Sequence, residues 1–143
     1  MEHLDRPSEE DWDERRLWFE EEQARATAGG VGRLSEQGAA LMVELQCCFC
    51  AGAWVASVLL AAAVVDAQAL YSGFPADELT EERSWLRQLR NGLLHENRSK
   101  PALTVEDHWT QRDLWRRHAK RAVRVAFASV HGTASPRRRA GRG

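Results

Sequence analysis

The sequence predicts an all-α protein, an up-and-down bundle of four to five helices. Apolar residues recur at the helical period in several segments, and no segment alternates apolar and polar residues as a half-buried strand does. The connections between these segments are short and contain glycine, proline or serine. A length of 143 residues, with 43% hydrophobic and 29% charged residues, is typical of a single soluble globular domain.

Charge is distributed unevenly along the chain, although the net charge is only −1. Residues 1–36 contain eleven acids and five bases, and residues 37–97 contain seven acids and three bases. Residues 98–143 contain three acids and twelve bases. These blocks carry −6, −4 and +9. The basic C-terminal block predicts an anionic partner, or self-association through complementary charge. We expect an acidic helix and Gly-rich linker in residues 1–33, the bundle in residues 34–130, and a disordered basic tail in residues 131–143.

The first helix is predicted from Glu9 to Ala26. Ser8 can cap it, and three acids follow in the first turn, near the positive end of the helix dipole. Its apolar side is narrow, so we expect it to pack through its aromatic residues. Glycines at positions 29, 30 and 32 end the helix. A phosphate-binding loop needs a preceding strand and a following lysine, so a linker is the better interpretation.

The segment from Ser35 to Tyr71 is predicted to be one long helix or two joined end to end. Its stretch from Cys47 to Val65 contains no charged residue and is long enough to span a membrane. Alanine, glycine, serine and cysteine promote insertion only weakly, so we predict a helix at the centre of the bundle instead. The cysteines of this stretch are too close together for a disulfide framework and lack partners for a zinc site. We interpret them as small helix residues of a cytoplasmic protein, and we expect no metal or cofactor.

The next helix lies within residues 80–100, TEERSWLRQLRNGLLHENRSK, and Thr80 is predicted to cap it. Leucines at helical spacing give it one buried stripe, and Arg90, Asn91 and His95 lie on the flank of that stripe. Asn91 and His95 are four residues apart and should therefore share a face. A guanidinium, an amide and an imidazole are groups that can bind and cleave a phosphodiester. The alternative is a polar helix end that closes its own last turn.

The last helix is predicted from Val105 to Val130, because Thr104 and Asp107 resemble a capping box. Four basic residues spaced by four form a basic stripe along it: Arg112, Arg116, Lys120 and Arg124. Such a stripe can face solvent, pair internally with the acidic N-terminal helix, or contact a nucleic-acid backbone.

The segment LRQLRNGLLHEN resembles the signature of the HEPN superfamily, small helical-bundle domains with an arginine, a polar residue, three further residues and a histidine. Here these residues are Arg90, Asn91 and His95. The Ala-rich segment SVLLAAAVVDAQALY resembles the first core helix of many such domains, and Asp66 falls where they often carry an acid. The likeness covers about residues 41–127. A looser match that ends at His118 lies in the middle of the last helix, and we interpret that histidine as a packed or surface residue.

This resemblance implies a metal-independent endoribonuclease of the toxin or defence type, with a composite site formed by two protomers. His95 would transfer protons, Arg90 would bind the scissile phosphate, Asn91 would orient His95 or contact the phosphate, and Asp66 would be a supporting acid. RNA would be guided by the basic stripe and by Arg87, Arg98 and Lys100. The expected partners are RNA, a second copy of the chain, and an antitoxin or regulatory protein.

The alternative is a catalytically inactive HEPN-like module that uses the same groove to bind a nucleotide or a protein partner. HEPN toxins neutralised by a partner nucleotidyltransferase often carry a tyrosine two residues after the histidine. That position is Asn97 here, and the one tyrosine is Tyr71 on another predicted helix. That particular antitoxin arrangement is therefore not predicted.

Overall fold

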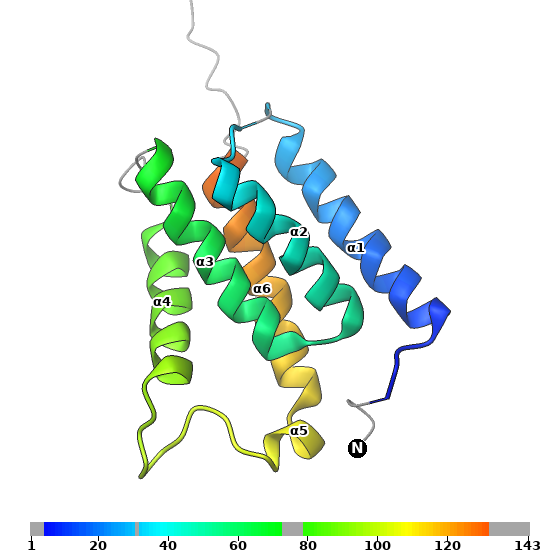
Figure 1. The fold of residues 1–143 in the computed structure, drawn as a ribbon, viewed down its shortest axis with the longest axis vertical. Helices are drawn as coiled ribbons and strands as arrows, with labels where there is room; N and C mark the ends of the chain where they lie inside the picture. Colours follow the sequence, from blue (N-terminus) through cyan, green and yellow to red (C-terminus); the bar gives the residue numbers. More distant parts are fainter. Residues whose placement is uncertain (1–4, 31, 73–78, 132–143) are drawn as a thin grey trace, which may run out of the picture.

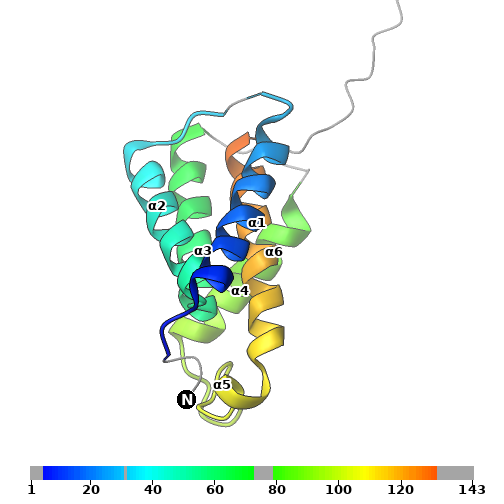
Figure 2. The same ribbon diagram turned by 90° about the vertical axis from the view of Figure 1, so that its right-hand side faces the viewer.

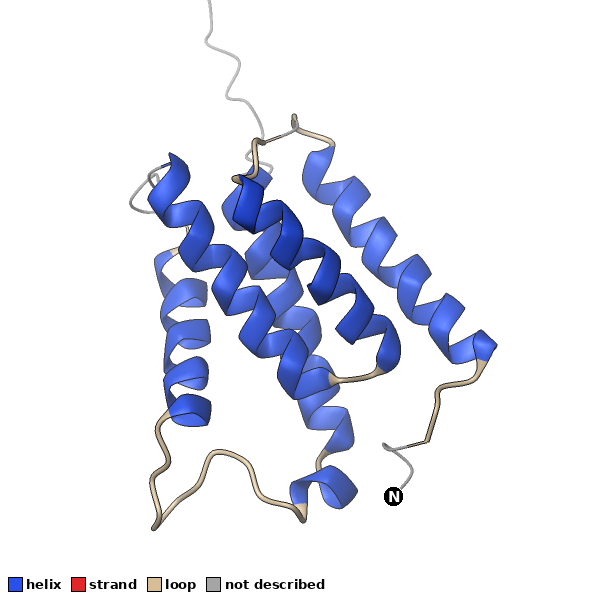
Figure 3. Cartoon of the chain, in the orientation of Figure 1, coloured by secondary structure: helices blue, strands red, loops and turns tan. Residues whose placement is uncertain are grey.

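The computed structural model describes residues 5–30, 32–72 and 79–131. Within these ranges the regular secondary structure is all helical, as predicted, and the helices are joined by loops without any strand (Figure 3). Five long helices run alternately up and down, and a short helix precedes the last of them (Figure 1). Their bounds are α1 Glu9–Thr27, α2 Glu36–Ala51, α3 Trp54–Ser72, α4 Thr80–Leu94, α5 Asp107–Thr110 and α6 Arg112–His131. None of the helices in these ranges is both long enough and apolar enough to cross a membrane.

The helix α1 begins as the sequence predicts. The Ser8 hydroxyl accepts a hydrogen bond from the Asp11 amide at 3.1 Å, and acids fill the first turn. The Phe19 ring is buried, and its centroid lies 5.9 Å from that of Phe49 on α2 and 5.1 Å from that of Phe127 on α6. The predicted packing of this helix through aromatic residues is therefore confirmed.

The apolar segment that follows forms two antiparallel helices, so the predictions of one long helix or of two joined end to end are wrong. After α2, Gly52 adopts φ 77° and ψ 19°, the left-handed conformation that glycine accepts without steric cost. The chain then reverses, and α3 packs back along α2 (Figure 1). The reversal makes a helical hairpin whose inner face is apolar.

Two other helix starts differ from the prediction. The N-cap of α4 is Leu79, whose side chain makes no capping bond, so Thr80 is the first helical residue rather than the cap. Thr104 and Asp107 do form the reciprocal capping box, with amide-to-side-chain distances of 2.8 and 3.2 Å. However, α5 itself begins only at Asp107, with Glu106 as its N-cap, and ends at Thr110, and α6 begins separately at Arg112. The single helix predicted from Val105 to Val130 is therefore two helices.

The hydrophobic core lies between α2, α3 and α6, and α1 and α4 cover it from opposite flanks (Figures 1 and 2). Its fully buried members are mostly alanine and valine, whose small side chains let the helices approach closely: Leu45, Phe49, Val58, Ala61, Val64, Ala119, Ala122, Val123 and Ala126. The predicted disordered tail falls on residues 132–143, outside the described residues, whereas His131 is the last residue of α6.

A bidentate ion pair fixes α4 against α6. The Arg121 guanidinium donates to both carboxylate oxygens of Glu82, at 2.9 and 2.6 Å, and it lies 4.0 Å from the centroid of the Trp85 ring. The hydrogen bond from Arg121 lowers the pKa of Glu82 below its ordinary value. The ion pair and the contact with the ring hold the first half of α4 against α6.

The Gly-rich linker after α1 docks onto the end of α6. The Gly32 amide donates to Nδ1 of His131 at 2.9 Å, and burial lowers the pKa of His131, which favours the neutral ring that accepts this bond. A Cβ atom added at Gly32 would lie 1.9 Å from the Val130 carbonyl oxygen. Only glycine fits at this position of the linker.

Gly32→Ala is expected to lower the free energy of unfolding by about 1–3 kcal/mol, the usual cost of forcing atoms into a packed site. Gly29→Ala is the matched control, because a Cβ atom there has nothing within 4 Å. It should change the stability by no more than about 0.5 kcal/mol. Urea unfolding followed by circular dichroism measures both values. Equal stabilities of the two variants would show that the linker does not dock on α6.

Candidate functional site

Arg90 is the centre of the candidate site. The buried Leu86 and the half-buried Leu89 and Leu93 turn α4 toward the core, which leaves Arg90 facing α3. Its guanidinium forms an ion pair with Asp66 of α3, and its other terminal nitrogen donates to Oδ1 of Asn91 at 3.2 Å. The Arg90 side chain is 26% exposed and that of Asp66 is 57% exposed. The pair therefore lies at the surface, open to an incoming anion.

Two further arginines of α4 line the same cleft as Asp66 and Arg90. Arg87 lies about one turn and Arg83 about two turns before Arg90, above small apolar residues of α3. Burial lowers the pKa of Arg83, and the charge of Arg87 lowers it further. Three guanidinium groups and one carboxylate give this cleft an excess of positive charge. Arg83 was not singled out from the sequence, although its spacing from Arg87 and Arg90 would have identified it.

His95 does not share a helical face with Asn91, so that prediction is wrong. The helix ends at Leu94, and His95 is the C-cap, with φ −121° and ψ 98°. Its amide donates to the Asn91 carbonyl at 2.9 Å, while its side chain is exposed. Among the described residues, Arg90 hydrogen-bonds Asp66 and Asn91 rather than His95. Within a single chain, hydrogen bonds thus join three of the four predicted site residues, Asp66, Arg90 and Asn91.

The cations predicted to guide RNA fall into two groups. Arg87, Arg98 and Lys100 are exposed, on α4 and on the loop that follows it. The basic stripe of α6 lies beside α1, because Arg124 pairs with Glu22 at 3.2 Å. This ion pair is an instance of one interpretation of the basic stripe, in which the stripe pairs with the acidic N-terminal helix.

The rest of the basic stripe also makes contacts within the chain. Lys120 lies 5.1 Å from the centroid of the Trp18 ring, Arg116 pairs with Asp113 at 2.9 Å, and Arg112 donates to the Gly52 carbonyl at 2.9 Å. Burial, followed by the charges of Arg116 and Arg124, lowers the pKa of Lys120. RNA binding by the stripe remains a prediction, and it would have to compete with these contacts.

His118 is a packed histidine, as interpreted from the sequence. Its ring lies between those of Trp85 and Trp115, with centroid distances of 5.7 and 5.3 Å. Burial, and then the charges of Arg121 and Arg117, lower its pKa. The histidine of the looser match to the HEPN signature therefore belongs to the packing between α4 and α6.

The described residues contain no group of three or more histidine, cysteine, aspartate or glutamate side chains placed to bind a metal ion. The cysteines are free thiols: Cys47 is exposed, and burial raises the pKa of Cys48 and Cys50, which keeps those two protonated. The candidate site therefore consists of arginine, carboxylate, amide and imidazole groups.

The protein is thus an all-α up-and-down bundle with a surface cleft between α3 and α4. Three arginines and one carboxylate, that of Asp66, line this cleft. No protein-family model matches this chain, and no curated protein or solved structure matches it. The function must therefore be argued from the residues themselves.

Proposed function

We propose that this protein is a HEPN-like, metal-independent endoribonuclease of the toxin or defence type. The observation that carries the proposal is the ion pair between Asp66 and Arg90, extended by the hydrogen bond from Arg90 to Asn91. It joins the two segments that carry the HEPN resemblance, 24 residues apart in sequence, at one surface cleft.

The chemistry needs one cation and two proton-transfer groups. Arg90 binds the scissile phosphate and stabilises the charge that develops on its equatorial oxygens. One imidazole takes the proton of the ribose 2′-OH, whose oxygen attacks the phosphorus, and a second imidazole protonates the departing 5′-oxygen. The P–O5′ bond breaks, and the products are a 2′,3′-cyclic phosphate and a 5′-OH.

A second copy of the chain completes this site in the proposal. Each protomer has one candidate imidazole, His95, whereas the reaction uses an acid and a base. Two protomers supply both, and the excess positive charge around Arg83, Arg87 and Arg90 attracts the RNA backbone into the shared cleft.

The test is cleavage of total RNA in EDTA by the wild-type chain, Arg90→Ala and His95→Ala. Wild type should cleave and leave 2′,3′-cyclic phosphate ends, and each variant should be slower by at least about 100-fold. Arg16→Ala, which removes an exposed arginine of α1, should retain activity. Intact RNA with micromolar wild-type protein, or cleavage that persists in both site variants, would contradict the proposal.

One observation favours the alternative, a catalytically inactive module that binds a nucleotide or a protein partner. Arg90 already donates to Asp66 and Asn91, and no side-chain hydrogen bond within the described ranges orients His95. A groove of this kind can bind an anion without cleaving it. Binding of RNA without cleavage, lost in Arg90→Ala and retained in His95→Ala, would identify this alternative.

A further inference from the structure

A second pocket opens on the other side of the bundle, between the first halves of α1 and α6. Its cavity volume is about 340 Å³, near the lower end of the range of small-molecule sites. Its lining includes three arginines and two tryptophans: Arg15, Arg112, Arg116, Trp54 and Trp109. The pocket lies beside the turn between α2 and α3, because Arg112 in its lining donates to the Gly52 carbonyl. In Figure 1 the helix α4 lies on the other side of the bundle from α1, which contributes Arg15 to the lining.

Arg15 and Arg112 both lie against the buried Trp54 ring, with guanidinium carbons 5.0 and 5.8 Å from its centroid. Arg15 donates to the Cys50 carbonyl at 3.2 Å, and Arg112 donates to the Gly52 carbonyl at 2.9 Å. These bonds satisfy carbonyls at the C-terminus of α2, and each guanidinium, with five N–H donors, retains others.

Neither of these arginines forms an ion pair with a carboxylate in the described part of the chain. Burial lowers the pKa of Arg112, and the nearby charge of Arg15 lowers it further, because the two cations repel each other. Two acids also line the pocket, but Asp113 is 85% exposed and pairs with Arg116 at 2.9 Å. An oxyanion between Arg15 and Arg112 would relieve their repulsion.

An exposed indole lies in the same lining. Trp109, on the short helix α5, is 58% exposed, although large aromatic side chains are normally well buried. Planar rings stack on exposed indoles, and nucleic-acid bases do so with little dependence on sequence. The pocket thus combines a site for an oxyanion with a site for a flat ring.

We propose that this pocket binds a nucleotide, with its phosphate between Arg15 and Arg112 and its base stacked on Trp109. The ligand is either a free mononucleotide or one nucleotide of a single-stranded nucleic acid. The proposal involves no bond cleavage and uses neither Arg90 nor His95, so it stands or fails independently of the ribonuclease proposal.

The experiment is a calorimetric titration at low ionic strength with uridine monophosphate, inorganic phosphate and uridine. Uridine monophosphate should bind saturably with one site per chain, phosphate about 10-fold more weakly, and uridine not measurably. Arg15→Gln and Arg112→Gln should each weaken nucleotide binding at least about 10-fold. Trp109→Ala should reduce nucleotide affinity to that of phosphate and leave phosphate binding unchanged.

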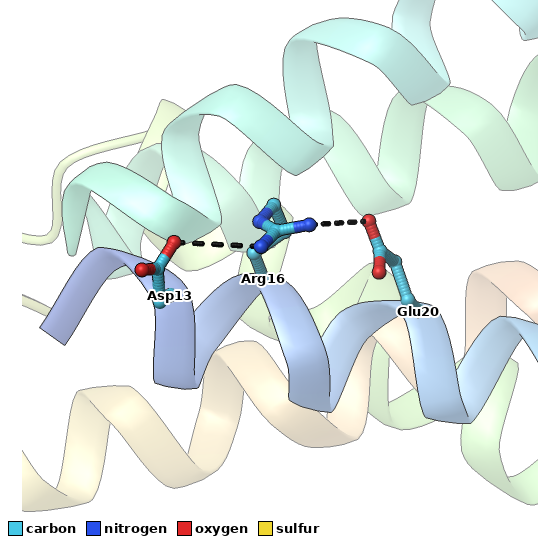
Figure 4. Close-up of polar contacts among 3 residues, drawn as sticks. All are labelled: Asp13, Arg16 and Glu20. Atoms are coloured by element: carbon cyan, nitrogen blue, oxygen red, sulfur yellow. Dashed lines mark hydrogen bonds and ion pairs between the residues drawn. The ribbon is translucent and has the colours of Figure 1, made fainter. Parts of the chain in front are cut away.

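Arg16→Gln is the matched control, because it removes the same charge one residue along α1. Figure 4 shows Arg16 lying between Asp13 and Glu20, which it pairs with at 3.4 and 3.5 Å. Its nucleotide affinity should stay within about 2-fold of wild type. His95→Ala should also bind normally, even if it abolishes RNA cleavage.

A short single-stranded oligonucleotide distinguishes the two sources of the ligand. If the oligonucleotide binds more tightly than the mononucleotide, and Arg112→Gln weakens both by the same factor, the ligand is a nucleic acid. If the oligonucleotide and the mononucleotide bind with equal affinity, the ligand is the free nucleotide. If Arg15→Gln or Arg112→Gln lowers the melting temperature markedly, Trp109→Ala decides, because its side chain is exposed. Absence of saturation at about 10 mM nucleotide, or an equal loss in Arg16→Gln, overturns the proposal.

Discussion

Replacing Arg90 by lysine is expected to slow RNA cleavage by about 100-fold, although the positive charge is retained. The Arg90 guanidinium pairs with Asp66 and donates to Asn91 from different nitrogens, and the proposed reaction adds the scissile phosphate to these partners. A planar fork with five donors can serve all three, whereas an ammonium group is a compact point charge that cannot reach them in the same geometry. Single-turnover cleavage of a labelled RNA in EDTA measures the rate.

Arg98→Lys is the matched control, since it makes the same substitution on the exposed loop after α4. It should remain within about 3-fold of wild type, because long-range attraction of RNA depends on charge rather than on donor geometry. The pair of Arg90 with Asp66 is partly solvated, so Arg90→Lys should cost at most about 1 kcal/mol of stability. If Arg90→Lys cleaved RNA at the wild-type rate, the reaction would not depend on the donor geometry of the Arg90 guanidinium.

The fold class could be predicted because helical periodicity and caps are local properties of the sequence. Ser8 and the Thr104–Asp107 pair form the predicted capping bonds. The helix breaks were missed because each depends on one residue within an otherwise continuous pattern. Gly52 ends α2 inside a charge-free stretch, and Gln111 separates α5 from α6. Of these two residues, only glycine is a recognisable signal of a helix end in the sequence.

The candidate site could be predicted only in part, because the packing of α3 against α4 is not a local property. The likeness to HEPN domains indicated Asp66 as a supporting acid, and the structure places that residue against Arg90. Spacing alone also predicted that His95 would share a face with Asn91, which fails because the helix ends at Leu94. Residue spacing predicts a shared face only while the helix continues.

The second pocket illustrates what the sequence does not reveal. Arg15 lies in an acidic helix, and its pattern suggests no more than a solvated charge. Its position over Trp54 depends on how α1 crosses the turn between α2 and α3, which only tertiary packing determines. The sequence pattern assigned Arg112 to the basic stripe predicted to contact nucleic acid, but it did not indicate that Arg112 lies against Trp54 and donates to the Gly52 carbonyl.

Phe49→Ala is expected to lower the free energy of unfolding by about 3–5 kcal/mol, the usual cost of truncating a buried phenylalanine. Phe49 is 0% exposed, and its ring centroid lies 4.8 Å from that of Trp18, 5.9 Å from that of Phe19 and 5.2 Å from that of Trp54. It therefore connects α1, α2 and α3 at one point, and its loss leaves a cavity bordered by rigid rings that cannot collapse to fill it.

This single ring bears on the nucleotide-pocket proposal, because it packs α1 against the turn beside which Arg15 and Trp54 lie. Typical domains are stable by only about 5–15 kcal/mol, so Phe49→Ala should remove a large part of the total. Val43→Ala on the same helix is the control: Val43 is 63% exposed, and its truncation should change stability by about 0.5 kcal/mol or less. Urea unfolding of both variants measures the difference. If Phe49→Ala is as stable as Val43→Ala, the three helices are not joined through this ring, and the placement of Arg15 beside Trp54 fails with it.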